Sequence, residues 1–249
     1  MICAIHQPQF LPWLGYFAKI AQSQTFVFLD DVQYKKNEWQ NRNRVRIADG
    51  WQWLTVPVKY KFGQKINEIF IDNSQDWRAK HWQALITNYQ RAPYFRDYRD
   101  FFQEVYQQEW EYLAKFNIYL IEEIMRFLGL KKEMKKSSDL RVEGKKTERL
   151  VEICKALGAD TYLSGSGAKD YLNLKLFEKV NIKVIFQNFL HPIYRQNYPG
   201  FEPNMSIIDL LFNEGKKNLS LLRGRENRTL TSYPLPLRER KGRRGGYYV

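Results

Sequence analysis

Short apolar runs that end in polar, reactive side chains are the feature that most constrains the fold of this 249-residue chain. The first run, residues 2–5, ends at His6, and the second, residues 26–29, ends at Asp30 and Asp31. A proline-rich turn and a short apolar-periodic segment separate them, which predicts strand, loop, helix and strand. Because ligands of open α/β sheets bind outside the carboxyl ends of the strands, we expect a site there.

The second half of the chain repeats this alternation of strands and helices. Residues 145–157 have the apolar spacing of an amphipathic helix, and residues 161–163 form a short apolar run that enters a Ser/Gly loop at 164–167. A brief helical piece and a buried strand over residues 182–186 follow. Alternation of strands and helices predicts an α/β fold, a mostly parallel sheet with flanking helices.

The segment between these halves predicts insertions into that sheet. Alternating residues around an Asp-Gly turn indicate a β-hairpin over residues 45–58, and residues 66–71 form another short strand candidate. Residues 72–74 supply N-cap side chains for a helix over residues 77–89. Aromatic side chains spaced three and four apart predict two more helices within residues 93–128.

Much of the formal net charge of +13 is concentrated at the end of the chain. Residues 223–249 hold eight Lys and Arg against two Glu, and they show neither helical nor strand periodicity. We therefore expect one α/β domain over residues 1–222, with a helical insertion at about 75–130, and a disordered basic tail over residues 223–249. A nucleic-acid or membrane arm is the alternative for this tail.

Several classes of protein are disfavoured by what the chain lacks. It contains no apolar run of 18 residues and no secretory signal, so we expect no membrane span and a cytoplasmic location. Cys3 and Cys154 lie in apolar surroundings and read as reduced core residues. No Ser-His-Asp order, HExxH motif or set of paired zinc ligands is present, which disfavours hydrolase triads and zinc catalysis.

Two clusters of candidate site residues lie in the first 44 residues. His6 could exchange protons near neutral pH, although a lone histidine is also commonly structural. Asp30 and Asp31 at a strand end could bind Mg²⁺ or ribose hydroxyls. The Arg, Asn and Gln side chains after these carboxylates are forked donors, which are suited to binding phosphate or carboxylate, and Trp39 adds a stacking surface among them. The alternative for this segment is a solvated, salt-bridged loop. The other candidates are Gln7, Trp13, Lys19, Asn37, Trp39, Gln40, Asn41, Arg42 and Arg44.

Two further clusters follow strands of the second half. The loop Ser164, Gly165, Ser166 and Gly167 could present backbone N–H groups to an anion, or could simply cap a helix. His191 is a second acid or base candidate, accompanied by Gln187, Tyr194 and Gln196. For Ser206 and Asp209 we favour a structural role at the start of a helix over residues 207–212, and for His81 we favour packing.

Several separated motifs resemble one bacterial family, the WbqC-like proteins. The motifs are HQPQFLPWLGYF at 6–17, FLDDVQ at 28–33, WQNRN at 39–43, YLSGSGA at 162–168, HPxYxQ at 191–196 and SxxDLLFN at 206–213. The resemblance covers residues 2–222 and leaves out the tail. It implies a role in O-antigen and other surface-polysaccharide biosynthesis. The opening layout is also similar to HIGH-type nucleotidyltransferases and pantoate-activating ligases, but Tyr16 follows Gly15 where HxGH would require histidine.

These observations favour a transferase acting on a nucleotide-linked sugar or related metabolite, with Mg²⁺ as a possible cofactor. His6 and His191 would exchange protons, and Lys19, Arg42, Arg44 and the 164–167 loop would bind anions. An adenylate-forming or nucleotidyltransferase-like enzyme is the first alternative. A nucleic-acid-binding module is another, disfavoured by the position of the charge, and a non-catalytic scaffold is the last. The sequence does not specify an oligomeric state.

Overall fold

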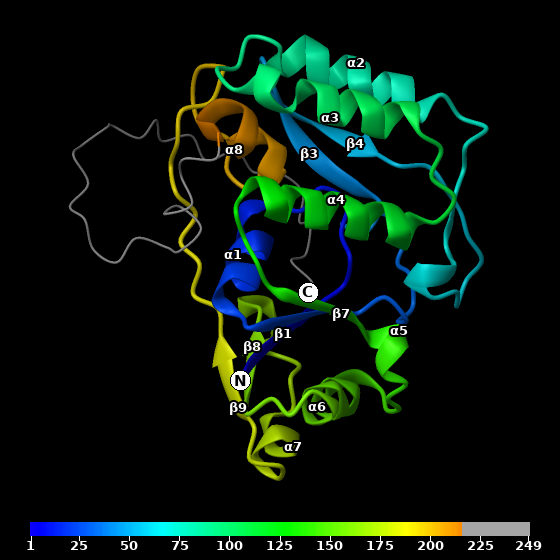
Figure 1. Cartoon of the computed structure of the whole chain (residues 1–249), viewed down its shortest axis with the longest axis vertical. Helices are drawn as coiled ribbons and strands as arrows, with labels where there is room; N and C mark the ends of the chain where they lie inside the picture. Colours follow the sequence, from blue (N-terminus) through cyan, green and yellow to red (C-terminus); the bar gives the residue numbers. More distant parts are fainter. Residues whose placement is uncertain (216–249) are drawn as a thin grey trace, which may run out of the picture.

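The computed structural model describes residues 1–215 and contains a five-stranded parallel sheet with strand order β7-β2-β1-β8-β9 (Figure 1). The strands are β1 Ile2–His6, β2 Thr25–Phe28, β7 Glu133–Lys136, β8 Thr161–Ser164 and β9 Lys183–Phe186. Helices flank this sheet, so the predicted α/β class is confirmed. The predicted tail at 223–249 lies outside the described residues.

Helices cover both faces of the sheet because its central strands are apolar on both faces. Ala4 of β1 packs in the same core as Phe17 of α1, which spans Leu14–Gln22. Its neighbours Cys3 and Ile5 pack in a second core with α6 (Lys146–Ala156) and α7 (Leu174–Glu178). Because successive residues of β1 face different cores, the apolar run at the start of the chain is uninterrupted. Both cysteines are buried and free, as predicted.

The central strands separate at their carboxyl ends. β1 pairs with β2 as far as His6, but it pairs with β8 only from Ile2 to Ala4. The chain runs from β1 to β2 and β7 on one side of the sheet, and from β8 to β9 on the other. The β1–β8 boundary is therefore the topological switch point, where ligands of open α/β sheets bind.

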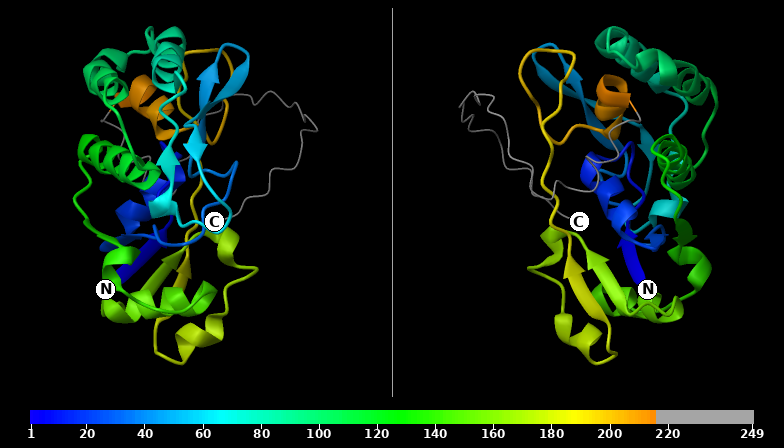
Figure 2. Two further views of the ribbon diagram at one scale, coloured as in Figure 1. Left: turned by 90° about the vertical axis from the view of Figure 1, so that its right-hand side faces the viewer. Right: turned by 60° about the vertical axis from the view of Figure 1, so that its left-hand side comes forward.

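The segment inserted between β2 and β7 places its hairpin and two of its helices, together with the last helix of the chain, at the opposite end of the molecule from α6 and α7, while α4 (Leu113–Phe127) lies between them and the sheet (Figures 1 and 2). The inserted segment comprises an antiparallel hairpin, a second two-stranded sheet and a set of helices. The other inserted elements are β3 Arg42–Ile47, β4 Gly50–Thr55, β5 Val58–Lys59, η1 Ile66–Glu68, β6 Phe70–Ile71, α2 Trp77–Tyr89 and α3 Phe95–Gln107. The last helix, α8 Ile207–Glu214, follows β9.

Four details differ from the sequence-based expectations. The hairpin ends at Thr55, and β5 pairs with β6 instead of extending it. Residues 66–71 divide into η1 and β6. The N-cap of α2 is Asp76, without a side-chain cap, because the Asp72 carboxylate accepts from Ser74 and Gln75 in the preceding turn. The sequence analysis also missed β7 and the short α5 (Ser137–Leu140) that follows it.

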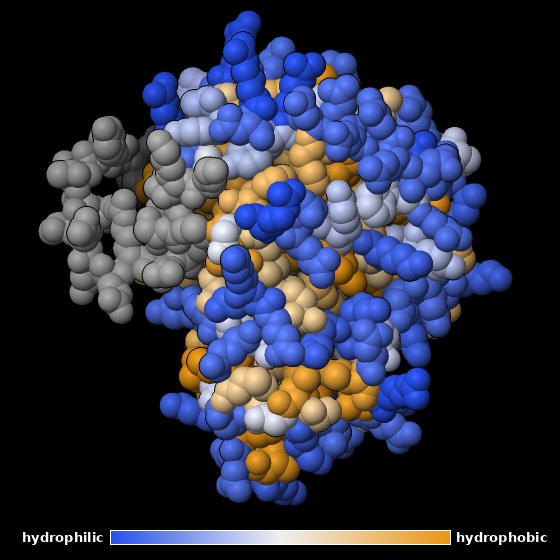
Figure 3. All heavy atoms as spheres, in the orientation of Figure 1, coloured by the Kyte–Doolittle hydropathy of each residue, from blue (hydrophilic) through white to orange (hydrophobic). Residues whose placement is uncertain are grey.

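The space-filling view shows hydrophilic side chains over the top and right-hand rim of this face, and apolar side chains gathered through its middle and lower part (Figure 3). Among the residues that the structure describes, none of the helices is both long and apolar enough to cross a membrane.

Candidate functional site

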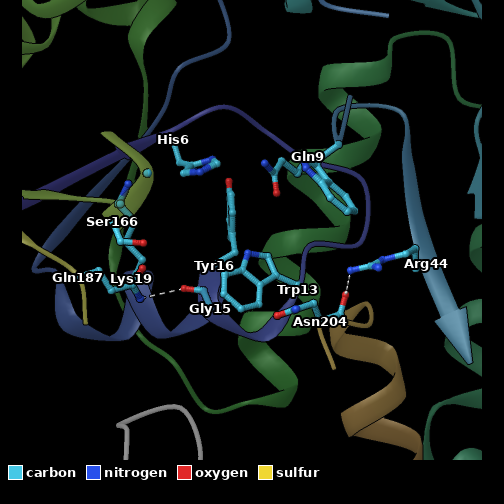
Figure 4. Close-up of a pocket in the computed structure, with 13 residues that line it drawn as sticks. His6, Gln9, Trp13, Gly15, Tyr16, Lys19, Arg44, Ser166, Gln187 and Asn204 are labelled. Atoms are coloured by element: carbon cyan, nitrogen blue, oxygen red, sulfur yellow. Dashed lines mark hydrogen bonds between the residues drawn. The ribbon is translucent and has the colours of Figure 1, made fainter. Parts of the chain in front are cut away.

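A cavity of ≈ 270 Å³ opens where β1 and β8 separate (Figure 4). The ends of the strands, the start of α1, the loop after β8 and the β3–β4 hairpin all contribute to its walls. The lining residues are His6, Gln9, Trp13, Gly15, Tyr16, Lys19, Trp39, Arg44, Gly165, Ser166, Gly167, Gln187 and Asn204. The cavity therefore lies at the strand ends, where the sequence analysis expects a site.

Lys19 brings a buried ammonium group to the gap between the strands. The His6 carbonyl accepts from Leu29 on the β2 side, so the carbonyl of the preceding residue, Ile5, faces the β8 side, where the strands have separated. Lys19 Nζ donates a 2.9 Å hydrogen bond to this Ile5 oxygen. The residue is 2% exposed, and burial lowers its pKa to about 7. None of the ion pairs within residues 1–215 includes Lys19.

His6 ends β1 as a neutral imidazole. Its Nδ1 lies 3.2 Å from the Gln7 carbonyl oxygen, which can only accept, so Nδ1 carries the proton and Nε2 is an acceptor. Burial, and after it the positive charge of Lys19, lower the pKa of His6 to about 3. The Tyr16 ring meets it edge-on with centroids 4.8 Å apart, and its hydroxyl donates to the same Gln7 oxygen. The ring is thus fixed with one acceptor nitrogen at the cavity (Figure 4).

Trp13 forms an aromatic wall at the start of α1. A Cβ built at Gly15 would lie 2.3 Å from the Trp13 ring, so only glycine allows the indole to lie across the helix at this point. Gln187, directly after β9, donates a 3.0 Å hydrogen bond to the Gly15 carbonyl. This bond joins the end of the fifth strand to the start of α1, and brings two predicted site residues, Trp13 and Gln187, to one cavity.

Arg44 and Trp39 form the wall on the hairpin side. Arg44 Nη2 donates a 3.2 Å hydrogen bond to the Asn204 carbonyl (Figure 4). Its Cζ lies 5.6 Å from the centroid of Trp39 and 5.0 Å from that of Trp51. Arg42 does not line the cavity; its Cζ lies 4.3 Å above Trp53 on the hairpin face. Of the two arginines predicted to bind anions, Arg44 therefore lines the cavity and Arg42 does not.

The Ser/Gly loop after β8 contributes three of its four predicted residues. Gly165, Ser166 and Gly167 line the cavity, and η2 (Ser166–Ala168) begins within the loop. Ser164 is instead fully buried at the end of β8. The small side chains leave backbone exposed at this wall, and anion binding by the loop remains a prediction.

The amide side chains predicted near the first loop support the backbone and do not line the cavity. Gln40 Nε2 donates to Gln7 Oε1 at 2.7 Å, and Gln40 Oε1 accepts from the Lys35 amide at 2.9 Å. Asn41 Nδ2 donates to the Val56 carbonyl at 2.9 Å. Asn37 adopts a left-handed φ of 62°, and its carbonyl accepts from Arg42. These residues fix the loop that carries Trp39.

Asp30 and Asp31 lie outside the cavity and hold α5 and α6 against β2. The Asp30 carboxylate accepts from the amide and the hydroxyl of Ser138 at 3.0 and 2.8 Å. Asp31 accepts from Ser137 at 2.5 Å and forms an ion pair with Arg149. With their oxygens engaged in this way, the two carboxylates do not fit the Mg²⁺ or sugar-hydroxyl role that the sequence suggested, and we assign them a structural one.

His191 lies behind Trp13 and supports it. Its Nε2 accepts from the Asn204 amide at 3.2 Å, and its Nδ1 donates to the Pro192 carbonyl at 2.8 Å. The ring is stacked on Trp13 at 14°, with centroids 6.2 Å apart, and burial lowers its pKa. Because both nitrogens are engaged, this arrangement leaves no imidazole atom for the acid or base role predicted from the sequence.

Tyr194 and Gln196 belong to a buried polar cluster around Asp209. They donate to the Asp209 carboxylate at 2.7 and 2.8 Å, and Tyr89 donates to it at 2.9 Å. Ser206 is the N-cap of α8, as expected, and accepts from the Ile208 amide. The cluster ties the loop after β9 to α8 and α2, so these side chains shape the molecule without lining the cavity.

Sequence reasoning missed Gln9, Tyr16 and Asn204 as lining residues. Asn204 has a left-handed φ of 59°, a conformation that asparagine tolerates better than most residues. Its position two residues before the α8 cap was the available signal for a tight turn. Nothing in the sequence indicated that this turn meets α1 and β3.

The lining contains two cationic side chains and no carboxylate. Lys19, Ser166 and Gln187 lie toward one side of the cavity in Figure 4 and Arg44 toward the other, with Trp13 and Tyr16 between them. Within residues 1–215, no group of three or more His, Cys, Asp or Glu side chains is arranged to hold a metal ion. The cavity is therefore suited to an anionic ligand with an apolar or aromatic portion.

Comparison with known proteins relates this chain to one protein family and to one curated protein. A family model described as the WbqC-like protein family matches residues 7–221. A protein of Mycobacterium tuberculosis (strain ATCC 25618 / H37Rv), described as uncharacterized, is 39% identical over 224 residues, which cover 88% of this chain and 96% of that protein. No solved structure was found to match.

Proposed function

This chain belongs to the WbqC-like protein family, and we propose that it is a transferase acting on a nucleotide-linked sugar or a related metabolite. As the family resemblance implies, we assign its reaction to bacterial O-antigen and other surface-polysaccharide biosynthesis, in the cytoplasm. The substrate binds in the cavity between the ends of β1 and β8.

The observation that carries this proposal is the pair of cations in a cavity without carboxylates. Lys19 approaches from α1 and Arg44 from β3, so the two charges come from different parts of the chain. A buried, unpaired ammonium group is unfavourable in the free protein, and a phosphate or pyrophosphate beside it removes that penalty. The guanidinium group adds a planar set of donors that suits phosphate oxygens.

His6 supplies the proton-accepting group of the proposed reaction. With Nδ1–H donated to Gln7, its Nε2 lone pair can accept a hydrogen bond from an attacking hydroxyl or amine. A bound phosphate offsets the charge of Lys19 and so raises the pKa of His6 from its low value in the free protein, which lets Nε2 take the proton. Burial, together with the charge of Lys19, keeps the imidazole neutral in the free protein, and Lys19 offsets negative charge that develops on the departing phosphate. Each group therefore has a separate task within one cavity.

Adenylate formation is a second candidate, favoured by the strand order. His6 lies at the switch point of the sheet, directly before α1, where nucleotide phosphates bind in doubly wound folds. In this version the protein joins a carboxylic acid to ATP and releases pyrophosphate. Pyrophosphate release that depends on a carboxylic acid distinguishes this reaction from simple group transfer.

The test is a thermal-shift screen of the full-length protein with ATP, other nucleoside triphosphates, nucleotide sugars and acyl-coenzyme A, each with and without Mg²⁺. A ligand present at ~100 times its Kd stabilises the folded state by about 2.7 kcal/mol. We expect a selective shift with a nucleotide-linked compound.

Two variants sharpen the screen. Lys19→Met removes the charge and keeps the length of the side chain, so we expect at least ~10-fold weaker binding, equivalent to about 1.4 kcal/mol. Lys80→Met, on the exposed surface of α2, serves as the matched control and should bind normally. The absence of any shift across the panel, or equal binding by both variants, would contradict the proposal.

A further inference from the structure

The cavity is small for the whole of a nucleotide-linked substrate. Its ≈ 270 Å³ falls below the roughly 300–1,000 Å³ typical of sites that enclose small organic ligands. We therefore expect part of such a substrate to lie outside, against residues that continue the cavity wall.

The exposed face of the β3–β4 hairpin continues that wall. Three indole rings and two guanidinium groups gather on it, and we call them the Trp–Arg platform: Trp39, Trp51, Trp53, Arg42 and Arg44. The ring centroids of Trp51 and Trp53 are 5.2 Å apart, and those of Trp39 and Trp53 are 5.5 Å apart. Trp39 and Arg44 belong both to the platform and to the cavity lining, so the two surfaces are continuous.

The strand register explains how these side chains come together. In the antiparallel hairpin, Arg44 lies opposite Trp53 and Arg46 lies opposite Trp51. Directly opposite residues project from the same face, and residues two apart in a strand share that face. The alternating pattern of both strands therefore places arginines and tryptophans on one side.

Two observations make the platform suited to a flat ring. Trp51 and Trp53 are each 37% exposed, which leaves indole surface in water next to the cavity. Arg42 and Arg44 lie over the rings and give the surface a positive charge. Aromatic platforms combined with arginine are the means by which proteins stack nucleic-acid bases with little base preference.

We propose that the Trp–Arg platform binds the heterocyclic base of the nucleotide while its phosphates lie in the cavity beside Lys19. This inference rests on the proposed function, because it assigns the base end of the same substrate. Stacking of one base on aromatic side chains accounts for about 5- to 150-fold in affinity. The platform binds any nucleobase. Purines have the larger ring area and bind more tightly than pyrimidines.

Isothermal titration of the full-length protein with ADP, UDP and inorganic pyrophosphate tests the assignment. We expect ADP to bind more tightly than UDP, and both to bind more tightly than pyrophosphate. Trp53→Ala should weaken ADP binding at least ~5-fold and leave pyrophosphate binding within ~2-fold, since it removes only ring contact. Trp51→Ala should act in the same direction. Phe62→Ala is the matched control, because Phe62 is 95% exposed and outside the platform.

The outcomes separate this inference from the proposed function. Equal affinities for ADP and pyrophosphate, or normal ADP binding by both tryptophan variants, overturn the platform assignment. Pyrophosphate binding that Lys19→Met weakens would still support the proposed function in that case. If neither ADP nor pyrophosphate binds, both proposals fail. A thymidine tetranucleotide that binds far more tightly than ADP identifies single-stranded nucleic acid as the occupant and overturns the assignment.

Discussion

Lys19 Nζ donates a 2.9 Å hydrogen bond to the Ile5 carbonyl oxygen, in the gap that opens where β1 separates from β8. Burial lowers the pKa of this amine from 10.5 to about 7. At a pH between these values, the unfolded chain holds a proton that the folded protein has released. The unfolded state therefore binds more protons, and the free energy of unfolding rises with pH across this window.

We predict that Lys19→Met flattens this pH dependence. The wild-type protein should gain up to about 1.4 kcal/mol of unfolding free energy per pH unit from Lys19 between pH 7 and 9, and the variant should lack that gain. Urea denaturation at several pH values measures the difference between the two slopes. Lys80→Met should keep the wild-type slope, and an unchanged slope in Lys19→Met would show that the Lys19 amine remains protonated in the folded protein.

His6 and His81 should both be neutral near pH 6. The pKa of His6 is lowered to about 3 and that of His81 to about 4, and burial also lowers the pKa of His191. Since unfolded histidines take up protons near pH 6.5, stability should fall as the pH drops below that value, by up to about 1.4 kcal/mol per unit for each fully depressed group. NMR of the imidazole resonances checks this directly. A midpoint between 6 and 7 assigned to His6 would be inconsistent with its buried, neutral state.

How much of the fold the sequence predicted depends on how each strand buries its residues. β1 and β2 are apolar on both faces, so residues 2–5 and 26–29 were recognisable as strands. β7 reads Glu-Met-Lys-Lys, because it lies at the edge of the sheet with its charged side chains in solvent. It pairs with β2 through backbone groups, which no side-chain pattern records, and a side-chain hydrogen bond, from Thr25 to Glu133, joins the ends of the two strands.

The residues of the candidate site that could be predicted are those whose contacts are with neighbours in the sequence. His6, Trp13 and Lys19 were found because a strand end and the helix after it are neighbours in the sequence. The contact between Arg44 and Asn204 joins residues 160 positions apart, and it depends on packing that local patterns do not encode. The pairing of Asp31 with Arg149, 118 positions away, was invisible for the same reason, and it changes how that carboxylate is interpreted.

Replacing Asp31 tests this structural interpretation. The side chains of Asp31 and Arg149 are 13% and 15% exposed, so Asp31→Asn leaves a largely buried guanidinium group without its ionic partner. We expect a loss of about 1–3 kcal/mol in the free energy of unfolding and no change in Mg²⁺-dependent nucleotide binding. Asp139→Asn, which removes an exposed ion pair with Lys136, should cost less than about 1 kcal/mol. Selective loss of Mg²⁺-dependent binding in a folded Asp31→Asn protein would restore the metal-site hypothesis.

The close approach of Trp13 to Gly15 gives the last prediction. A Cβ at position 15 would lie 2.3 Å from the indole, so Gly15→Ala must displace Trp13 from the cavity wall. We expect a loss of about 1–3 kcal/mol of stability, partly offset by the better helix propensity of alanine, together with weaker nucleotide binding.

The double variant Trp13→Ala/Gly15→Ala identifies the cause of that loss. With the indole removed, the extra methyl group has room, so urea denaturation should show a combined cost smaller than the sum of the two single costs. Additive costs would mean that Gly15 matters for its backbone and not for the indole. In that case the weaker binding by Gly15→Ala could not be attributed to a displaced Trp13.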